Sequence, residues 1–187
     1  MAPRPNPPHH EIIPIPVGAP DRASMLEMCT NVRIDVFVHE QKFSLDEEID
    51  EYDATATHFL LRLLPSNEPI GTIRAYCSSG ATYYKLSRLA VLKEYRKYSF
   101  GRELVLALHD WVKQDATSRG LTTVKIVSHS QIPVKGFYAK FGYTPEGEEF
   151  DEDGAPHQKM ILHLSLSTTT TTTTTCVPLS PAPESEA

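Results

Sequence analysis

LSRLAVLKEYRKYSFGRE, residues 86–103, is the stretch of sequence that decides the fold of this chain. It begins inside an apolar run, Tyr84–Val91, that is typical of a β-strand, and it ends where an amphipathic helix starts at Gly101. The first backbone N–H groups of a helix are unpaired and attract anions. The stretch therefore predicts a strand, an anion-binding turn and the start of a helix. The region around the turn is basic: from Lys85 to Arg102 it has one acid, Glu94, and the cations Lys85, Arg88, Lys93, Arg96, Lys97 and Arg102.

The segments before this stretch alternate between strand-like and helical periodicity. Glu11–Val17 contains two prolines, so it predicts a first strand at the edge of a sheet. Apolar residues at helical spacing predict a helix over Ala23–Phe37. A polar, acidic segment, Glu40–Thr57, separates this helix from two strand-like runs, His58–Leu64 and Pro69–Cys77, which look like a hairpin.

The segments after it continue the alternation. An apolar face predicts a helix over Gly101–Arg119, with Gly120 as a suitable residue to end it. The remaining elements are a short strand Thr123–Val127, a short helix Pro133–Phe141, a loop entered through Tyr143–Gly147, and a last strand Gln158–Leu164. This order predicts an α/β (α+β) fold, with helices across a mixed sheet.

A length of 187 residues suits one domain with a single core. We expect proline-rich residues 1–10 and residues 167–187, with eight consecutive threonines, to be disordered tails around a domain over 11–166. The net charge of −6 argues against nucleic acid or a membrane as partner. No segment is typical of a signal peptide or a membrane span, so we expect a cytoplasmic protein, with the nucleus also open to it. Cys29, Cys77 and Cys176 lack metal-ligand spacing, so we expect no metal.

Several short motifs follow one another in a consistent order from residue 33 to residue 164. They are Arg33-x-x-Val36-Phe37-Val38-x-Glu40-Gln41, Ile70-Gly71-Thr72-x-Arg74, Leu86-x-Arg88-x-Ala90-Val91, Tyr95-Arg96, Phe137-Tyr138-x-x-Phe141-Gly142-Tyr143 and Gly147-Glu148-x-Phe150-x-Glu152-x-Gly154-x-x-His157-x-x-Met160. In this order they resemble the GNAT superfamily of N-acetyltransferases, and within it the ElaA-like/YjcF-like branch of fungal type. The resemblance implies a GNAT-like single domain with a mixed, mostly antiparallel central sheet flanked by helices. It also implies acetyl-CoA as the co-substrate.

The resemblance further implies where acetyl-CoA binds. Leu89, Ala90 and Val91 would hold the pantetheine arm, with a backbone N–H that polarises the thioester carbonyl. The family's phosphate motif has glycine at its fourth position, where this chain has Ser99. If that position needs a positive φ, the serine costs about 1 kcal/mol, although it can instead act as helix N-cap or bind a phosphate. The residues expected to lie at the pyrophosphate are Arg96, Lys97, Ser99, Phe100, Gly101 and Arg102.

Direct acetyl transfer to an amine needs a neutral nucleophile, a stabilised oxyanion and a proton for the departing thiolate. By resemblance, Tyr138 supplies that proton and contacts the cofactor. An alkylammonium with a pKa of ~10.4 is charged at neutral pH, so a base must take its proton. We expect that base among Glu48, Asp53 and His157, with His58 as a further candidate. The residues expected to bind the acceptor are Arg33, Phe37, Glu40, Gln41, Arg74 and Arg88.

The sequence leaves the acceptor open. Two acidic clusters on the acceptor side suit the primary amine of a small molecule, such as an aminosugar, a polyamine or an arylamine. A protein lysine or an N-terminal amine is the alternative within the same chemistry. Two other classes of function stay open. One is an acyl-CoA-binding sensor without turnover, because Ser99 departs from the glycine of the family's phosphate motif. The other is an interaction module that uses the acidic segments. The enzyme would act alone or as a homodimer.

Overall fold

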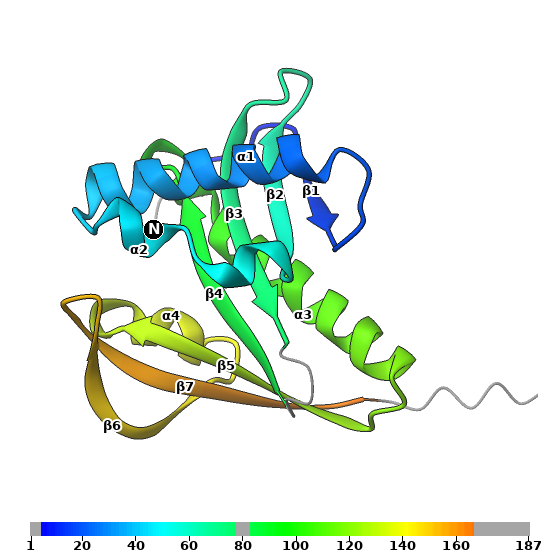
Figure 1. Ribbon diagram of the computed structural model, residues 1–187, viewed down its shortest axis with the longest axis vertical. Helices are drawn as coiled ribbons and strands as arrows, with labels where there is room; N and C mark the ends of the chain where they lie inside the picture. The colour runs from blue at the N-terminus through cyan, green and yellow to red at the C-terminus, as the bar shows by residue number, and fades with distance from the viewer. Residues whose placement is uncertain (1–4, 78–82, 167–187) are drawn as a thin grey trace, which may run out of the picture.

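Within residues 5–77 and 83–166, the part of the chain that this computed structural model describes, seven strands form one sheet in the order β1-β2-β3-β4-β5-β7-β6 (Figure 1). Neighbouring strands are antiparallel except β4 and β5, which are parallel. The predicted α/β (α+β) class, a mixed and mostly antiparallel sheet flanked by helices, is confirmed. The strands are β1 His10–Ile15, β2 Thr57–Leu63, β3 Pro69–Tyr76, β4 Tyr83–Val91, β5 Thr123–Gln131, β6 Thr144–Glu152 and β7 Ala155–Ser165.

Two long helices cover opposite faces of strands β2–β4 (Figure 1). Because alternate residues of a strand point to opposite faces, β2 serves both layers. Leu60 packs with Ile15 and Cys29 under α1, whereas Phe59 and Leu61 belong to the larger core against α3. The helical segments are α1 Arg22–Arg33, a π-helix η1 Ile34–Glu40, α2 Leu45–Glu48, η2 Glu51–Ala54, η3 Lys93–Tyr98, α3 Phe100–Ser118, η4 Ile132–Val134 and α4 Lys135–Ala139.

The parallel strands β4 and β5 stay together over only part of their length. Their register joins Tyr83–Leu86 to Lys125–Ser128, and beyond these residues β5 pairs with β7 alone. On its other side β4 keeps β3, with a bulge between the pairs Arg74↔Ser87 and Thr72↔Ala90. Arg88 lies in that bulge with a φ of 54°. The sheet is therefore split, and its two halves separate beyond the middle of β4.

The polar, acidic segment Glu40–Thr57 contains the short helices α2 and η2. The predicted helix over Ala23–Phe37 begins at Arg22, becomes a π-helix after Arg33 and runs to Glu40. Ser44 then opens α2 with a capping box, since its side chain accepts the N–H of Asp46 and its own N–H is bonded to Glu47. These turns bring the acidic residues of the segment over the sheet.

Two predictions from the sequence were wrong in the lower half of the sheet. The loop expected after Tyr143–Gly147 is the strand β6, and the strand expected to stop at Val127 runs to Gln131. β6 is an edge strand with an irregularity between Pro145 and Glu149, so it tolerates proline, glycine and exposed acids that are typical of loops. In both cases pairing with β7 extends a strand through a polar sequence.

Part of the predicted N-terminal tail contacts the sheet, since the carbonyl of His9 accepts the N–H of Leu64 at 2.8 Å. The first strand starts at His10, which was expected in the N-terminal tail, and the His10 Nε2 atom lies 2.8 Å from Glu103 of α3. Residues 1–4 and the threonine-rich segment 167–187 lie outside the described residues. Across the parts of the chain that are described, no helix is long and apolar enough to span a membrane.

Candidate active site

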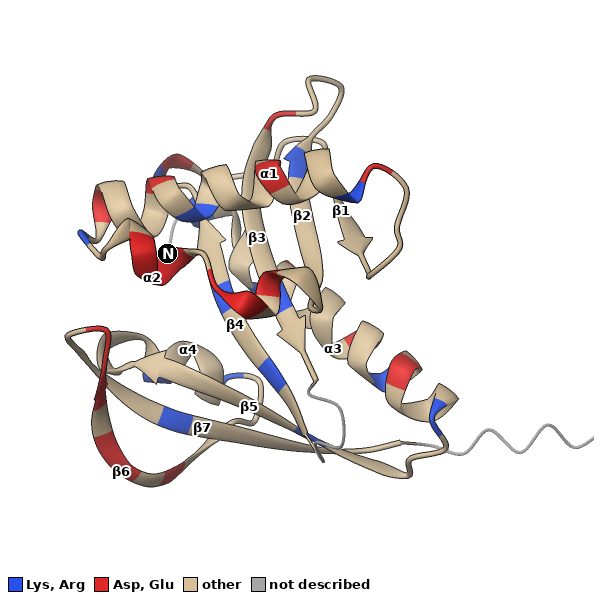
Figure 2. Cartoon of the chain, viewed as in Figure 1, with Lys and Arg blue, Asp and Glu red and all other residues tan. Residues whose placement is uncertain are grey.

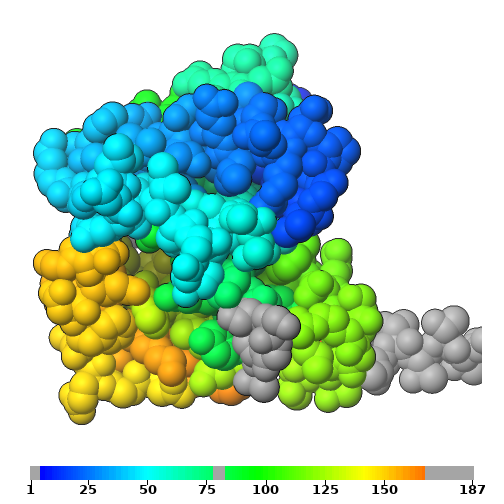
Figure 3. All heavy atoms as spheres, viewed as in Figure 1, coloured from blue at the N-terminus to red at the C-terminus, as the bar shows by residue number. Residues whose placement is uncertain are grey.

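A cleft of about 1230 Å³ opens where β4 and β5 separate. Figure 3 shows it as a hollow between the blue and cyan upper half, which holds α1, α2 and β1–β3, and the yellow and orange lower half with β6 and β7. Most of the predicted site residues meet in its wall. They are Phe37, Gln41, Glu48, Arg74, Arg88, Leu89, Val91, Arg96, Ser99, Gly101, Arg102, Tyr138 and His157.

The structure places the remaining predicted site residues outside that wall. The side chain of Ala90 packs against Val32 and Val36, and Phe100 is fully buried in the main core. These two residues can therefore offer only backbone atoms to a ligand in the cleft. The full set outside the lining is Arg33, Glu40, Asp53, Ala90, Lys97 and Phe100, together with the further candidate His58.

The basic turn holds Ser99 in the left-handed region, at φ 66° and ψ 21°, immediately before α3. This is a conformation that glycine adopts freely, so a serine here costs on the order of 1 kcal/mol. The Ser99 carbonyl accepts the N–H of Arg102 at 2.9 Å in the first turn of the helix. Because Ser99, Gly101 and Arg102 all line the cleft, the N-terminus of this 19-residue helix forms one end of it. That placement suits an anionic group of a ligand.

Arg96 of the same turn is held from two sides. Its Nε donates to the Val91 carbonyl at 2.9 Å, and its two terminal nitrogens contact the Glu40 carboxylate at 2.7 and 2.8 Å. The hydrogen bond from Arg96 lowers the pKa of Glu40. Glu40 therefore contacts the basic turn, whereas the sequence assigned it to the binding of the acceptor.

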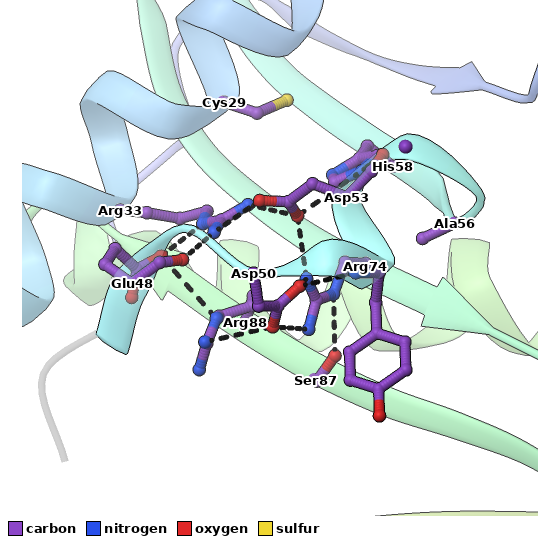
Figure 4. A network of polar contacts seen from close by, with 12 residues as sticks. Cys29, Arg33, Glu48, Asp50, Asp53, Ala56, His58, Arg74, Ser87 and Arg88 are labelled. Carbon is purple, nitrogen blue, oxygen red and sulfur yellow. Dashed lines mark hydrogen bonds and ion pairs between the residues drawn. The ribbon is translucent and has the colours of Figure 1, made fainter. Parts of the chain in front are cut away.

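Six charged residues form what we call the arginine network: Arg33, Arg74 and Arg88 with Glu48, Asp50 and Asp53 (Figure 4). Arg33 is completely buried and donates to both Asp53 oxygens, at 2.8 and 3.1 Å, and to the Glu48 carboxylate. Arg74 bridges Asp50 and Asp53 at 2.6 and 2.7 Å and reaches the Ser87 hydroxyl at 3.0 Å. The network ties α1, the segment 45–54 and β3–β4 together.

The network occupies two of the carboxylates predicted as bases. Burial would raise the pKa of Asp53, but the hydrogen bonds and charges of Arg33 and Arg74 outweigh it and lower that pKa. Both Asp53 oxygens are engaged, so this carboxylate has little capacity to accept a proton. Burial raises the pKa of Glu48 against the opposing charge of Arg33. His58 is fully buried, and its Nε2 lies 3.1 Å from the Asp53 carbonyl.

Tyr138 of α4 lies at the cleft with its side chain almost wholly buried, at 7% exposure. Burial raises the pKa of its phenol, while a hydrogen bond with Ser128 of β5 partly opposes that shift. Its ring packs edge-on against Phe137 and Tyr143, with centroids 5.3 and 5.7 Å away. A buried, protonated phenol at this place can give a proton to a leaving group.

A second group of polar residues, which we call the histidine cluster, lies across the cleft from the arginine network and consists of Lys85, His129 and Glu152. The Nδ1 atom of His129 lies 2.9 and 3.0 Å from the two oxygens of Glu152. Lys85 of β4 stands 3.8 Å from the same carboxylate, and all three side chains line the cleft. His157 is beside it, stacked on Phe150 with ring centroids 6.2 Å apart.

His129 was not singled out from the sequence, because the strand that carries it was expected to end at Val127. Its signal was the alternation in Ser128-His129-Ser130-Gln131, where polar residues extend the period of the preceding strand. Glu152 was named as a position of the last motif and as one acid of a cluster, and no role at the site was assigned to it. Within the described residues, no group of three or more His, Cys, Asp or Glu side chains is placed to hold a metal ion.

Comparison with known proteins places this architecture in a family. The sequence profile of the family described as Acetyltransferase (GNAT) domain matches residues 25–164. YyaT of Bacillus subtilis is 37% identical over 143 residues, which cover 75% of this chain and 90% of YyaT. The uncharacterized N-acetyltransferase YjcF of the same bacterium is 33% identical over 131 residues, 70% of this chain and 86% of YjcF. The crystal structure of Escherichia coli ElaA has the same fold, with a TM-score of 0.67 at 22% identity over 81% of this chain and 98% of ElaA.

Proposed function

The chain belongs to the GNAT family of acetyltransferases, and we propose that it moves an acetyl group directly from acetyl-CoA to the primary amine of a small molecule. The observation that carries the proposal is the split between β4 and β5, with a helix N-terminus at one end of the cleft and a buried tyrosine in its wall. The relation to YjcF predicted from the sequence is confirmed and ElaA shares the fold, whereas the ElaA-like branch of fungal type stays a prediction.

The residues of the cleft fit a long, partly anionic acyl carrier. Beyond Leu86, β4 no longer pairs with β5. The backbone groups of Leu89–Val91 on that side of β4 can therefore pair with the extended pantetheine arm. The pyrophosphate would lie at Ser99–Arg102, where backbone N–H groups and cations converge. Acetyl-CoA supplies the activated acetyl group, and a backbone N–H of Leu89–Val91 would stabilise the charge that develops on the thioester oxygen.

Tyr138 is the proton donor in this proposal. As the amine nitrogen bonds to the acetyl carbon, the carbon–sulfur bond breaks and the sulfur takes the phenolic proton. The nitrogen of the new amide loses its surplus proton, which restores the phenol of Tyr138. Burial raises the pKa of Tyr138, so the phenol is neutral and holds its proton before the carbon–sulfur bond breaks. Asp53 is not retained as a base, because both of its oxygens are bonded to arginine.

A contact across the cleft favours a small acceptor over a protein. Gln131 at the end of β5 donates to the Gln41 side chain at the end of η1, with 3.0 Å between nitrogen and oxygen. This bridge joins the two halves of the molecule at the opening and narrows the approach for a folded protein. The alternative acceptor is a protein lysine or an N-terminal amine, which peptide substrates test.

The experiment is release of free thiol from acetyl-CoA across a panel of aminosugars, polyamines, arylamines and lysine peptides. We expect at least one small amine to release thiol, and acetyl-CoA alone to raise the melting temperature. Peptides as the only substrates would favour the protein-acetylating alternative. A thermal shift without turnover on any amine would favour the sensor and reject the proposal.

Tyr138→Phe tests the proposed acid. We expect it to lower kcat by about 10²–10⁴-fold with little change in acetyl-CoA affinity. Tyr143→Phe is the matched control, because Tyr143 is also buried, with its hydroxyl 2.9 Å from His109, but does not line the cleft. Equal activity of the two variants would remove Tyr138 from the donor role.

A further inference from the structure

The position of His129 relative to Tyr138 follows from the geometry of one strand. Successive side chains of β5 point to opposite faces of the sheet. Ser128 points to the face of the main core, which contains Tyr138, because its register partner on β7 is the core residue Met160. His129, the next residue, therefore points to the opposite face, where it meets Lys85 of β4 and Glu152 of β6. The strand separates the buried phenol from the imidazole at the point where β4 and β5 part.

The contacts of His129 fix the role of each ring nitrogen. Both Glu152 oxygens lie within 3.0 Å of Nδ1, whereas the Lys85 ammonium, which can only donate, is farther from it at 3.4 Å. The two shorter contacts favour the tautomer in which Nδ1 carries a proton and donates it to the carboxylate. In neutral imidazole the other nitrogen, Nε2, then has the free lone pair. The ring of Phe150 packs edge-on at a centroid distance of 4.9 Å and limits its rotation. His129 is 27% exposed and lines the cleft, so a ligand there can reach it.

We propose that His129 is the general base that removes the proton from the acceptor amine, and that Glu152 is the residue that positions it. The inference rests on the proposed acetyl transfer. His129 Nε2 takes one proton from the ammonium of the acceptor, and the lone pair left on the nitrogen attacks the acetyl carbon. The resulting imidazolium is stabilised by Glu152 across the Nδ1–H hydrogen bond, and solvent later carries its proton away.

The surroundings of His129 support a change of charge at this site. Lys85 faces it from β4, Glu152 from β6, and His157 and Lys159 from β7, where Lys159 is the direct register partner of His129. Lys159 is itself 2.5 Å from Glu146, so its charge is balanced locally. Figure 2 shows the acidic residues along β6 at this edge. The carboxylate of Glu152 is thus left to the pair His129 and Lys85.

The other candidate bases are less suited by their contacts. Glu48 is 3% exposed and is bonded to Arg33, and its Oε1 lies 3.6 Å from Arg88. His157 is 8% exposed, and its Nδ1 is bonded to the carbonyl of Ala155 at 2.9 Å. Glu48 is thus held by arginine. The ring of His157 donates to a backbone carbonyl, which stabilises an imidazolium less than the Glu152 carboxylate does for His129.

Two variants and two matched controls test the inference, using an amine that the wild-type protein acetylates. His129→Gln removes the base, and the control His163→Gln changes an exposed histidine of β7. Glu152→Gln removes the positioning carboxylate, and the control Glu149→Gln changes an exposed β6 carboxylate that is paired with Lys135 instead. The readouts are kcat/KM from pH 5 to 9 and the thermal shift with acetyl-CoA.

We expect His129→Gln to lower kcat/KM by about 10²–10⁴-fold and to abolish the rise of the profile with pH that a histidine base produces. Glu152→Gln should lower it less and move that rise to lower pH, because the protonated ring loses its anionic partner. The controls should keep the wild-type profile, and all four variants should keep the acetyl-CoA shift.

The outcomes separate this inference from the proposed function. If the wild type is active and His129→Gln matches His163→Gln in rate and profile, His129 is not the base, while acetyl transfer still stands. An unmoved profile in Glu152→Gln would remove Glu152 from the positioning role. If the wild type acetylates no amine, both proposals fall together.

Discussion

The arginine network and the histidine cluster face the same cleft, and both combine carboxylates with cations, yet they differ in what their carboxylates can still do. In the arginine network, Asp53 receives bonds from two arginines and Arg33 is inaccessible to solvent. In the histidine cluster, Glu152 holds one side of an imidazole that is partly exposed to the cleft. The first arrangement fixes structure because every charge is used. The second leaves one nitrogen for chemistry.

The largest effect should come from removing the centre of the arginine network. Arg33→Met leaves Glu48 and Asp53 buried without their main partner, so we expect the free energy of unfolding to fall by about 3–5 kcal/mol. Urea denaturation at pH 7 measures it. Glu152→Gln is the comparison from the other cluster, and we expect about 1 kcal/mol or less because that pair is partly exposed. Equal losses in both variants would contradict the contrast between the two regions.

The next effect concerns the histidine inside the arginine network. Burial lowers the pKa of His58 to about 4, against the hydrogen bond with Asp53, whereas in the unfolded chain it is ~6.5. Between pH 7 and pH 5 the unfolded state therefore binds a proton that the folded state does not. As the pH falls from 7 to 5, His58 should therefore lower the free energy of unfolding by about 2 kcal/mol.

His58→Gln should remove that part of the pH dependence, measured as the difference in unfolding free energy between the two pH values. Burial also lowers the pKa of His109 to about 4, so a similar contribution should persist in the variant. The depressed pKa of Asp53 matters only at more acidic pH, below the range of the experiment. A variant with the same pH dependence as the wild type would show that His58 is not a buried neutral histidine.

A smaller effect is expected at the end of the cleft, where α3 begins. Ser99→Gly relieves the left-handed conformation of Ser99, so we expect unfolding to become about 1 kcal/mol less favourable while the acetyl-CoA shift persists. Ser99→Ala keeps the strain and should not stabilise the protein. If glycine abolishes binding of acetyl-CoA, the serine hydroxyl is a ligand, which the sequence left as an alternative.

The smallest effect should come from Glu40, which ends the helix η1 and contacts Arg96 of the basic turn. Glu40→Gln frees the Arg96 guanidinium from a half-exposed pair, so we expect acetyl-CoA to bind about 2–5-fold more tightly. Calorimetric titration at two salt concentrations measures it, and the gain should shrink at high salt. Weaker binding in the variant would show that Glu40 positions Arg96 for the ligand instead of competing with it.

Much of the fold was predictable from the sequence because hydrophobic periodicity reports local structure directly. The helix at Gly101 and the hairpin of His58–Leu64 with Pro69–Cys77 were correct to within one or two residues. β6 was missed, because an edge strand buries little and its composition resembles a loop. The same error hid the end of β5, and with it His129.

The sequence by itself determined the order of the strands and long helices apart from β6, the basic turn before α3 and the family to which the chain belongs. These depend on residues near one another in the chain, whose spacing sets local conformation and charge. Only the tertiary structure decided which of the many acids are held by arginine and which stands behind a histidine. Arg33 of α1 meets Asp53 of η2, and His129 of β5 meets Glu152 of β6, because the fold brings separate elements together. Whether a carboxylate is free to act depends on such partners, and a one-dimensional pattern does not contain them.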